Sequence, residues 1–198
     1  MWFAAALTDQ LVTLALGFAL TTVAGGLLGA WLQQRTWNNQ HSRTLAEADR
    51  DHATQLCREL SQIMDRRLYR MWQLNWALFA PELDQSRVDA RLDEYRVVLY
   101  EWNDSLNRNL AAAEILFGSA ARRRLELEIL EGFREVGAKL ELRYRELRQP
   151  QPSRDVSLGE ADLSFELAQM RERVYSMTLD MLGHIREERV GRQLAAVS

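Results

Sequence analysis

Two short spacings combine a histidine with a carboxylate and could hold a metal ion. Asp49 precedes His52 by three residues, and Glu188 follows His184 by four. Residues three or four apart share one face of a helix, so each pair could present two metal ligands together. Counted along the helices expected below, His52 and His184 fall at nearly the same height. Asp49, His52, His184 and Glu188 are therefore the candidate metal ligands.

We favour a structural role for the polar residues at this height of the bundle. A di-iron bundle uses two Glu-x-x-His motifs with two further glutamates, and neither motif occurs in this chain. Buried His52, Asn109 and His184 would instead form a polar layer that fixes the register of packed helices. Metal-dependent or RNA-directed chemistry at this layer is the last alternative. We therefore assign no catalytic residue, no metal and no cofactor.

The composition favours an all-α protein. Only three prolines and ten glycines occur in 198 residues. The 25 basic and 28 acidic side chains leave a formal charge of −3, which argues against a nucleic-acid partner. Cys57 is the only cysteine, so no intrachain disulfide can form, and a lone thiol agrees with a reducing compartment.

Apolar side chains alternate three and four residues apart over four segments. These segments cover about 43–79, 84–117, 119–148 and the region from 157 onward. Pro81, Gly118 and the loop 149–156 separate them, and Ser157 with Glu160 has the form of a capping box. The pattern predicts an antiparallel up-down-up-down four-helix bundle with long coiled-coil-like helices over residues 43–198.

An uncharged stretch near the N-terminus predicts a membrane anchor. Residues 11–32 contain no Asp, Glu, Lys or Arg, and as a helix they would span roughly 33 Å, enough for a bilayer core. We expect an N-terminal transmembrane helix within residues 1–33 and a juxtamembrane segment over 34–42. Arg35, Arg43 and Arg50 follow the span, and no basic residue precedes it. This asymmetry predicts a single-pass protein of the cell (inner) membrane, with its N-terminus outside and its bundle in the cytoplasm.

Small residues recur every fourth position within the predicted span. Such a ridge allows close approach of a second helix, which predicts membrane packing between copies and a homo-oligomer. The ridge consists of Thr13, Gly17, Thr21, Gly25 and Gly29. The alternative function that follows is a homo-oligomeric membrane pore or effector, although the span offers little polarity for a water-filled lumen.

Arginines gather in segments that the bundle topology brings to one end. Three of them open the third helix, where they oppose the helix dipole, so contact with anionic lipid headgroups is expected instead. The candidate headgroup ligands are Arg35, Arg43, Arg122, Arg123, Arg124, Arg186, Arg189 and Arg192. The competing interpretation is a solvated face whose charge is balanced by nearby glutamates.

Tyr69, Trp72, Trp76 and Phe79 lie three or four residues apart near the end of the first long helix. With neighbouring apolar residues they surround more of the helix than one bundle seam requires, which indicates a partner-binding surface. A cytoplasmic protein or a second protomer could cover it. The sequence therefore predicts a membrane-anchored interaction or scaffold protein that self-associates and has no catalytic activity.

Overall fold

The computed structural model describes the backbone of residues 2–148 and 159–191. Side chains are described at positions 33, 34 and 37 and, within those backbone ranges, from residue 43 onward. The chain divides into two compact units, residues 1–47 and 48–198, and each is considered by itself. In the first unit the backbone is helical from residue 2, as part of α1 (Trp2–Leu78).

The predicted membrane segment lies where side chains are not described. Over the described residues, no helix combines the length and the apolar character needed to cross a bilayer. The side chains of residues 11–32, including those of the small-residue ridge, are not described, so this finding does not cover them. The transmembrane helix therefore stays a prediction.

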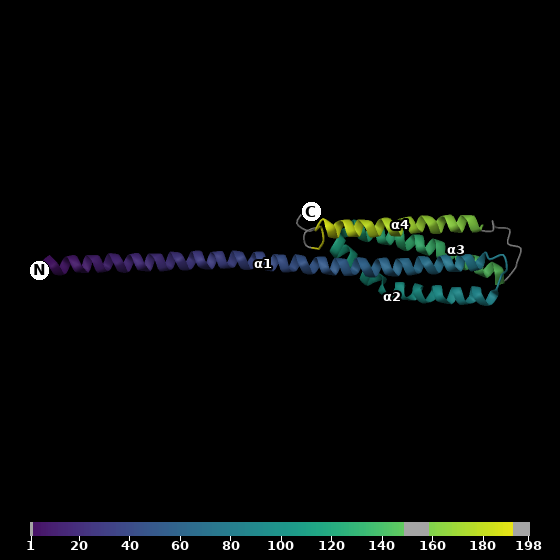
Figure 1. Cartoon of the computed structure of the whole chain (residues 1–198), viewed down its shortest axis with the longest axis horizontal. Coiled ribbons are helices and arrows are strands. Elements are labelled where there is room, and N and C mark those ends of the chain that lie inside the picture. Colours follow the sequence, from purple (N-terminus) through teal and green to yellow (C-terminus); the bar gives the residue numbers. More distant parts are fainter. Residues whose placement is uncertain (1, 149–158, 192–198) are drawn as a thin grey trace. The chain divides into compact units, whose positions relative to one another are not determined.

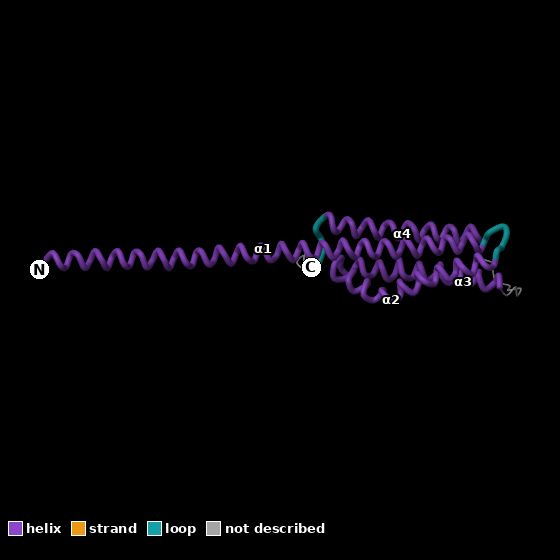
Figure 2. Tube along the Cα trace, turned by 60° about the horizontal axis from the view of Figure 1, so that its bottom comes forward, coloured by secondary structure: helices purple, strands orange, loops and turns teal. Residues whose placement is uncertain are grey.

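The second unit is all-α, and its described helical pieces pack antiparallel (Figures 1 and 2). The end of α1 is followed by α2 (Gln85–Arg124), the π-helix η1 (Leu125–Leu130), α3 (Glu131–Arg148) and α4 (Glu160–Arg186). Polar contacts join neighbours around the bundle. Arg66 pairs with Glu101 between α1 and α2 at 2.5 Å, and the Ser61 and Thr178 hydroxyls meet at 3.1 Å between α1 and α4.

Gly118 reverses the chain within the segment assigned to α2. Its φ of 87° and ψ of 171° are not helical, and positive φ is readily adopted only by glycine. Glu114 and Arg122 form an ion pair across the break at 2.7 Å, and the Tyr144 hydroxyl near the end of α3 donates to Asp89 near the start of α2 at 2.9 Å. The prediction that Gly118 separates two antiparallel helices is confirmed.

The other helix ends are close to the expected ones. α1 ends at Leu78, and Asp84 caps α2 by accepting hydrogen bonds from the backbone N–H groups of Ser86 and Arg87 at 3.0 and 3.3 Å. α4 begins at Glu160 with Gly159 as its N-cap, so Glu160 takes the first helical position. A capping box requires it at the third position, so that register was wrong; Ser157 itself lies outside the described residues.

The core follows the three-and-four spacing of the sequence. Trp102, Tyr95 and Phe133 are its largest fully buried side chains, and each large apolar side chain removed from water stabilises the fold by roughly 1.5–3 kcal/mol. The matching residues of α1 and α4 are buried as well. They are Ala53, Leu56, Cys57, Leu60, Ile63, Met64, Leu68, Met71, Leu74, Leu163, Leu167, Met170, Val174, Met177, Met181 and Ile185.

Candidate functional site

The predicted polar layer does not form as one level. Asn109 is buried and its Nδ2 donates to the Ser105 hydroxyl at 3.2 Å. His52 is exposed and lines a surface groove with Asn109, whereas His184 lines a different cavity. The expectation that His52 is buried was wrong. The buried line of α1 runs through Ala53, one position away, so His52 points to the side.

The four candidate metal ligands are not gathered in one place. Among the described residues, no group of three or more His, Cys, Asp or Glu side chains is placed to hold a metal ion. Glu188 instead pairs with Arg50 at 3.5 Å, which joins the start of the bundle segment of α1 to the turn after α4. At Gly191 a Cβ would collide with the Asp49 carboxylate, so this turn packs closely on α1.

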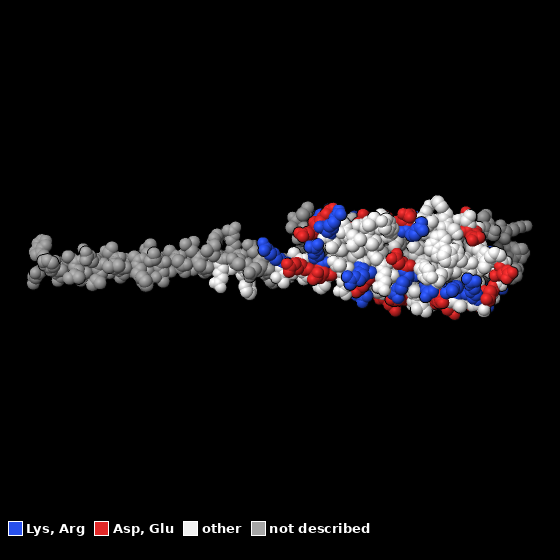
Figure 3. Space-filling model, in the orientation of Figure 1, with Lys and Arg blue, Asp and Glu red and all other residues white. Residues whose placement is uncertain are grey.

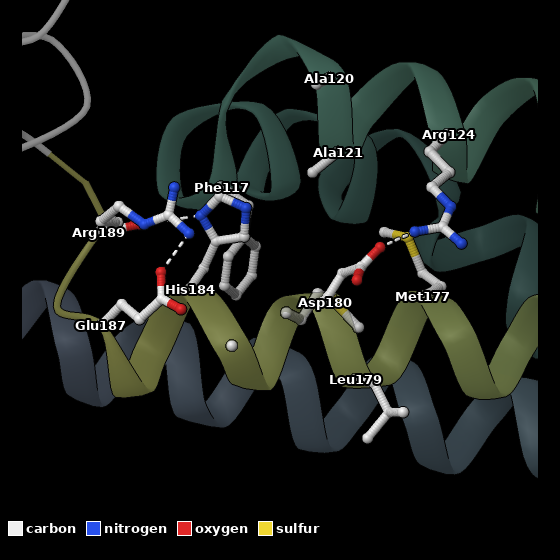
Figure 4. Close-up of a pocket in the computed structure, with 12 residues that line it drawn as sticks. Phe117, Ala120, Ala121, Arg124, Met177, Leu179, Asp180, His184, Glu187 and Arg189 are labelled. Carbon is white, nitrogen blue, oxygen red and sulfur yellow. Dashed lines mark hydrogen bonds and ion pairs between the residues drawn. The ribbon is translucent and has the colours of Figure 1, made fainter.

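A cavity of about 410 Å³, here called the end pocket, opens beside the Gly118 turn (Figure 4). Phe117, Met177 and Met181 supply its apolar lining, and Ala120, Ala121 and Gly183 leave room because they are small. The rings of His184 and Phe117 pack edge to face, with 6.3 Å between their centroids and 73° between their planes. The end pocket thus has an apolar interior with ionisable groups around it.

The ionisable groups of the end pocket are satisfied by one another. Arg124 points toward Asp180 and forms an ion pair with it, as Figure 4 shows, and its Nη2 donates to the Ser176 hydroxyl at 2.8 Å. Arg189 pairs with Glu187, and the Arg189 carbonyl lies 3.3 Å from Nδ1 of His184. The contacts of Arg189 fix the turn after α4. Together with the Arg124–Asp180 pair, they leave little unpaired charge to recognise a ligand.

A second cavity, here called the aromatic groove, lies between α1 and α4. It has a volume of about 430 Å³ and is lined by Asp65, Leu68, Tyr69, Trp72, Trp76 and Arg171. Tyr69 and Trp76 are 54% and 56% exposed, although both are large aromatic side chains. In the view of Figure 3 charged side chains are dense along the lower edge of the bundle, over α2, and at its upper left end, and a broad uncharged surface lies between them.

The aromatic side chains of the groove are held in place by their neighbours. The Trp72 and Trp76 rings are tilted by 40° with centroids 5.8 Å apart. Gln73 donates to the Tyr69 hydroxyl at 2.8 Å, and the guanidinium of Arg70 lies 5.8 Å from the Tyr69 ring centroid. A fixed surface loses little conformational entropy on binding.

Three of the four predicted partner-binding residues meet in this groove, and Phe79 does not. Phe79 lies beyond the end of α1, where it is half-buried against the core. The guanidinium of Arg143 covers its ring at 5.1 Å from the centroid. The Phe79 N–H still donates to the Asn75 carbonyl at 3.2 Å, so helical spacing alone does not exclude Phe79 from the groove; its ring is instead covered by Arg143 of α3.

Three of the six predicted headgroup arginines whose side chains the structure describes are paired with carboxylates. Arg122 pairs with Glu114, Arg124 with Glu128 and Asp180, and Arg189 with Glu187. These pairs give the arginines a local structural role despite the unfavourable helix dipole. Arg43, Arg123 and Arg186 are exposed, and the side chains of Arg35 and Arg192 lie outside the described residues.

Arg67 is a buried cation that the sequence analysis did not single out. It is 2% exposed, and its guanidinium lies 4.7 Å from the Phe133 ring centroid and 5.5 Å from that of Trp102. Burial lowers the pKa of Arg67, while the Tyr95 hydroxyl raises it. In the described part of the structure, its Nε and Nη1 have no hydrogen-bond partner. Contacts with the two rings compensate part of the cost of burying the charge.

The apolar spacing of α1 contained a signal for this arginine. Leu60, Met64, Arg67, Met71 and Leu74 alternate four and three residues apart, and all are buried. Arg67 therefore occupies a core position of the same stripe. A charged residue at a core position predicts aromatic or anionic neighbours that compensate its burial.

Comparison of the chain with protein-family models, curated proteins and solved structures gave no match.

Proposed function

We propose that the chain is a single-pass, membrane-anchored interaction protein whose helical bundle presents the aromatic groove to another protein surface. The observation that carries this proposal is the groove itself, in which Tyr69 and Trp76 are more than half exposed beside Trp72 and Leu68. Exposed aromatic side chains fixed in a concave surface are typical of protein interfaces. No catalytic residue is part of this proposal.

In the proposed arrangement an N-terminal transmembrane helix precedes an up-down-up-down four-helix bundle with coiled-coil-like helices. The uncharged segment 11–32 supports the anchor, and the arginines that follow it support a cytoplasmic bundle at the inner membrane. Alkaline carbonate should leave the chain in the membrane pellet. Release into the supernatant would contradict the anchor.

Contact with anionic headgroups is a further part of the proposal. Arg123 is exposed, and no ion pair is recorded for it in the described residues. Replacement of Arg123 by Glu should weaken binding of the detergent-purified chain to vesicles that contain anionic lipid, and should leave binding to neutral vesicles unchanged. An equal effect on both vesicle types would contradict headgroup contact.

The interaction function is tested by photo-crosslinking in intact cells. Tyr69 is replaced by p-benzoylphenylalanine in the full chain, and Tyr100 of α2 serves as the matched control because it is a tyrosine of similar exposure, 63%, outside the groove. We expect a discrete protein adduct at position 69, weakened by Trp76→Ala, and little or no adduct at position 100. Equal crosslinking at both positions, or none at position 69, would contradict the function.

A further inference from the structure

The two walls of the aromatic groove each carry a charged side chain with little compensation from the rest of the chain. Asp65 on α1 is exposed, and within the described part of the structure no hydrogen bond or ion pair is recorded for its carboxylate. Partial burial raises the pKa of this carboxyl group. Arg171 on α4 is 62% exposed and reaches the adjacent Glu172 at 3.7 Å, a long contact.

The two charges are placed so that the grooves of two copies can complement each other. Asp65 and Arg171 line the same groove, so they lie at about the same height on antiparallel helices. A half-turn rotation about an axis parallel to the groove would place α1 of one copy opposite α4 of another. The same rotation would bring each Asp65 opposite an Arg171 without any shift along the helices.

We infer that a second copy of this chain occupies the aromatic groove, across a two-fold axis parallel to the helices, with Asp65 of each copy facing Arg171 of the other. This inference rests on the proposed function and names the partner of the same groove. Tyr69, Trp72 and Trp76 of both copies form the apolar centre, and the two ion pairs form its edges. The parallel arrangement also suits two chains anchored in the same membrane.

The surface of α4 extends this interface beyond the groove. Tyr175 and Leu182 follow Arg171 by four and eleven residues, positions that share its side of the helix. They are 60% and 48% exposed. The apolar strip therefore continues for roughly 16 Å along α4, which adds contact area that the groove alone lacks.

An antiparallel dimer makes a different prediction. A two-fold axis across the groove would place α1 opposite α1 and α4 opposite α4. Asp65 would then not face Arg171, and reversal of either charge would have little effect on the association. Charge reversal thus separates the two arrangements, as well as separating a second copy from an unrelated protein.

The test uses the full chain in detergent, with p-benzoylphenylalanine at position 69 and a different affinity tag on each of two preparations. One preparation also carries Asp65→Arg and the other Arg171→Asp. Asp93→Arg and Arg134→Asp are the matched controls, because these residues are 77% and 75% exposed on α2 and α3 and do not line the groove. Circular dichroism checks that all variants keep the helical fold.

We expect the chain that carries the crosslinker at position 69 and no charge reversal to give an adduct of two chains. Asp65→Arg or Arg171→Asp alone should lower its yield at least about tenfold, because like charges then meet twice in each dimer. A mixture of the two variants should restore the adduct between different tags, since each reversed charge faces its opposite. The control variants should behave like the unsubstituted chain.

Three results would overturn the inference: full yield from both single variants, no recovery in the mixture, or an adduct whose mass is not that of two chains. The last result would leave the interaction function standing with a different partner. Absence of any adduct in detergent would overturn the inference alone, because the interaction function is contradicted only when position 69 gives no adduct in intact cells.

Discussion

The aromatic groove and the end pocket have similar volumes, about 430 and 410 Å³, but their charged side chains differ in how they are satisfied. In the end pocket Arg124 and Asp180 pair with each other, as do Glu187 and Arg189. In the groove no such pair is recorded for Asp65 within the described residues. Cavity volume alone therefore does not separate the two, whereas the charges that remain available to another molecule do.

Their apolar residues differ in the same sense. Phe117, Met177 and Met181 of the end pocket are each at most 2% exposed, so they belong to the core of the bundle. Tyr69 and Trp76 of the groove are mostly exposed, so their apolar surface contributes little to folding. This difference suggests that the end pocket serves the turn after α4, and that the groove serves a partner.

The largest expected effect separates the core tryptophan from a groove tryptophan. Trp102 is 1% exposed, so Trp102→Ala should lower the free energy of unfolding by about 3–5 kcal/mol. Trp76→Ala should lower it by about 0.5 kcal/mol or less, because Trp76 is 56% exposed. Urea unfolding followed by circular dichroism, at a concentration where the chain is monomeric, measures both. Equal losses would mean that Trp76 belongs to the core.

Two glycines compare the room in the core of the bundle with that in the end pocket. A Cβ at Gly137 would lie 2.5 Å from the Tyr95 hydroxyl, so Gly137→Ala should destabilise the bundle by about 1–3 kcal/mol. A Cβ at Gly183, which lines the end pocket, would meet no atom within 4 Å, so Gly183→Ala should stabilise α4 by roughly 0.5–1 kcal/mol. Thermal unfolding compares them. Destabilisation by Gly183→Ala would show that the end pocket is tighter than described.

The paired and available charges should respond differently to removal. Arg124→Ala loses ion pairs with Asp180 and Glu128, and Arg124 is only 25% exposed, so a loss of about 1 kcal/mol is expected. Asp65→Asn should change the free energy of unfolding by less than a few tenths of a kcal/mol, because no contact is recorded for its carboxylate in the described residues. Chemical denaturation of the two variants side by side measures this. A comparable loss from both would remove the distinction between the sites.

The smallest expected effect concerns acid. Hydrogen bonds from Arg148 and Tyr144 lower the pKa of Asp89, so its contribution is present above the unfolded-state pKa of about 3.9 and is lost as the pH falls through the lower folded-state value. The pKa of Asp65 is raised, so its sign is opposite: stability increases as the pH falls through the folded-state value. Melting temperatures from pH 6 to pH 2 should therefore fall less steeply for Asp89→Asn than for the natural chain. Asp65→Asn should make the fall slightly steeper, and the same slope for both variants would be inconsistent with these shifts.

The bundle could be predicted from the sequence because its signals are local. Pro81 and Gly118 end helices through the conformation of their own backbone. The spacing of apolar residues indicates the buried side of each helix. The π-helix Leu125–Leu130 could not be predicted. Its buried residues Leu125 and Ile129 are four apart, which is equally suitable for an α-helix.

The candidate site was predicted only in part, because it depends on contacts between helices. The spacing of Tyr69, Trp72 and Trp76 identified one wall of the groove. The second wall, with Arg171, became visible only when α4 was placed beside α1. His52 shows the limit of counting along helices, since an error of one position turns a side chain by about 100° and moves it from the core to the surface.

The central claim, that another protein surface covers the aromatic groove, is tested most directly by hydroxyl-radical footprinting of the intact chain in its native membranes. Tyr69 and Tyr100 have the same chemistry and similar exposed fractions, 54% and 63%, in the single chain. We predict that Tyr69 is oxidised several-fold more slowly than Tyr100, and that dilution in detergent brings the two rates together. Similar rates in the membrane would show an open groove and contradict the account.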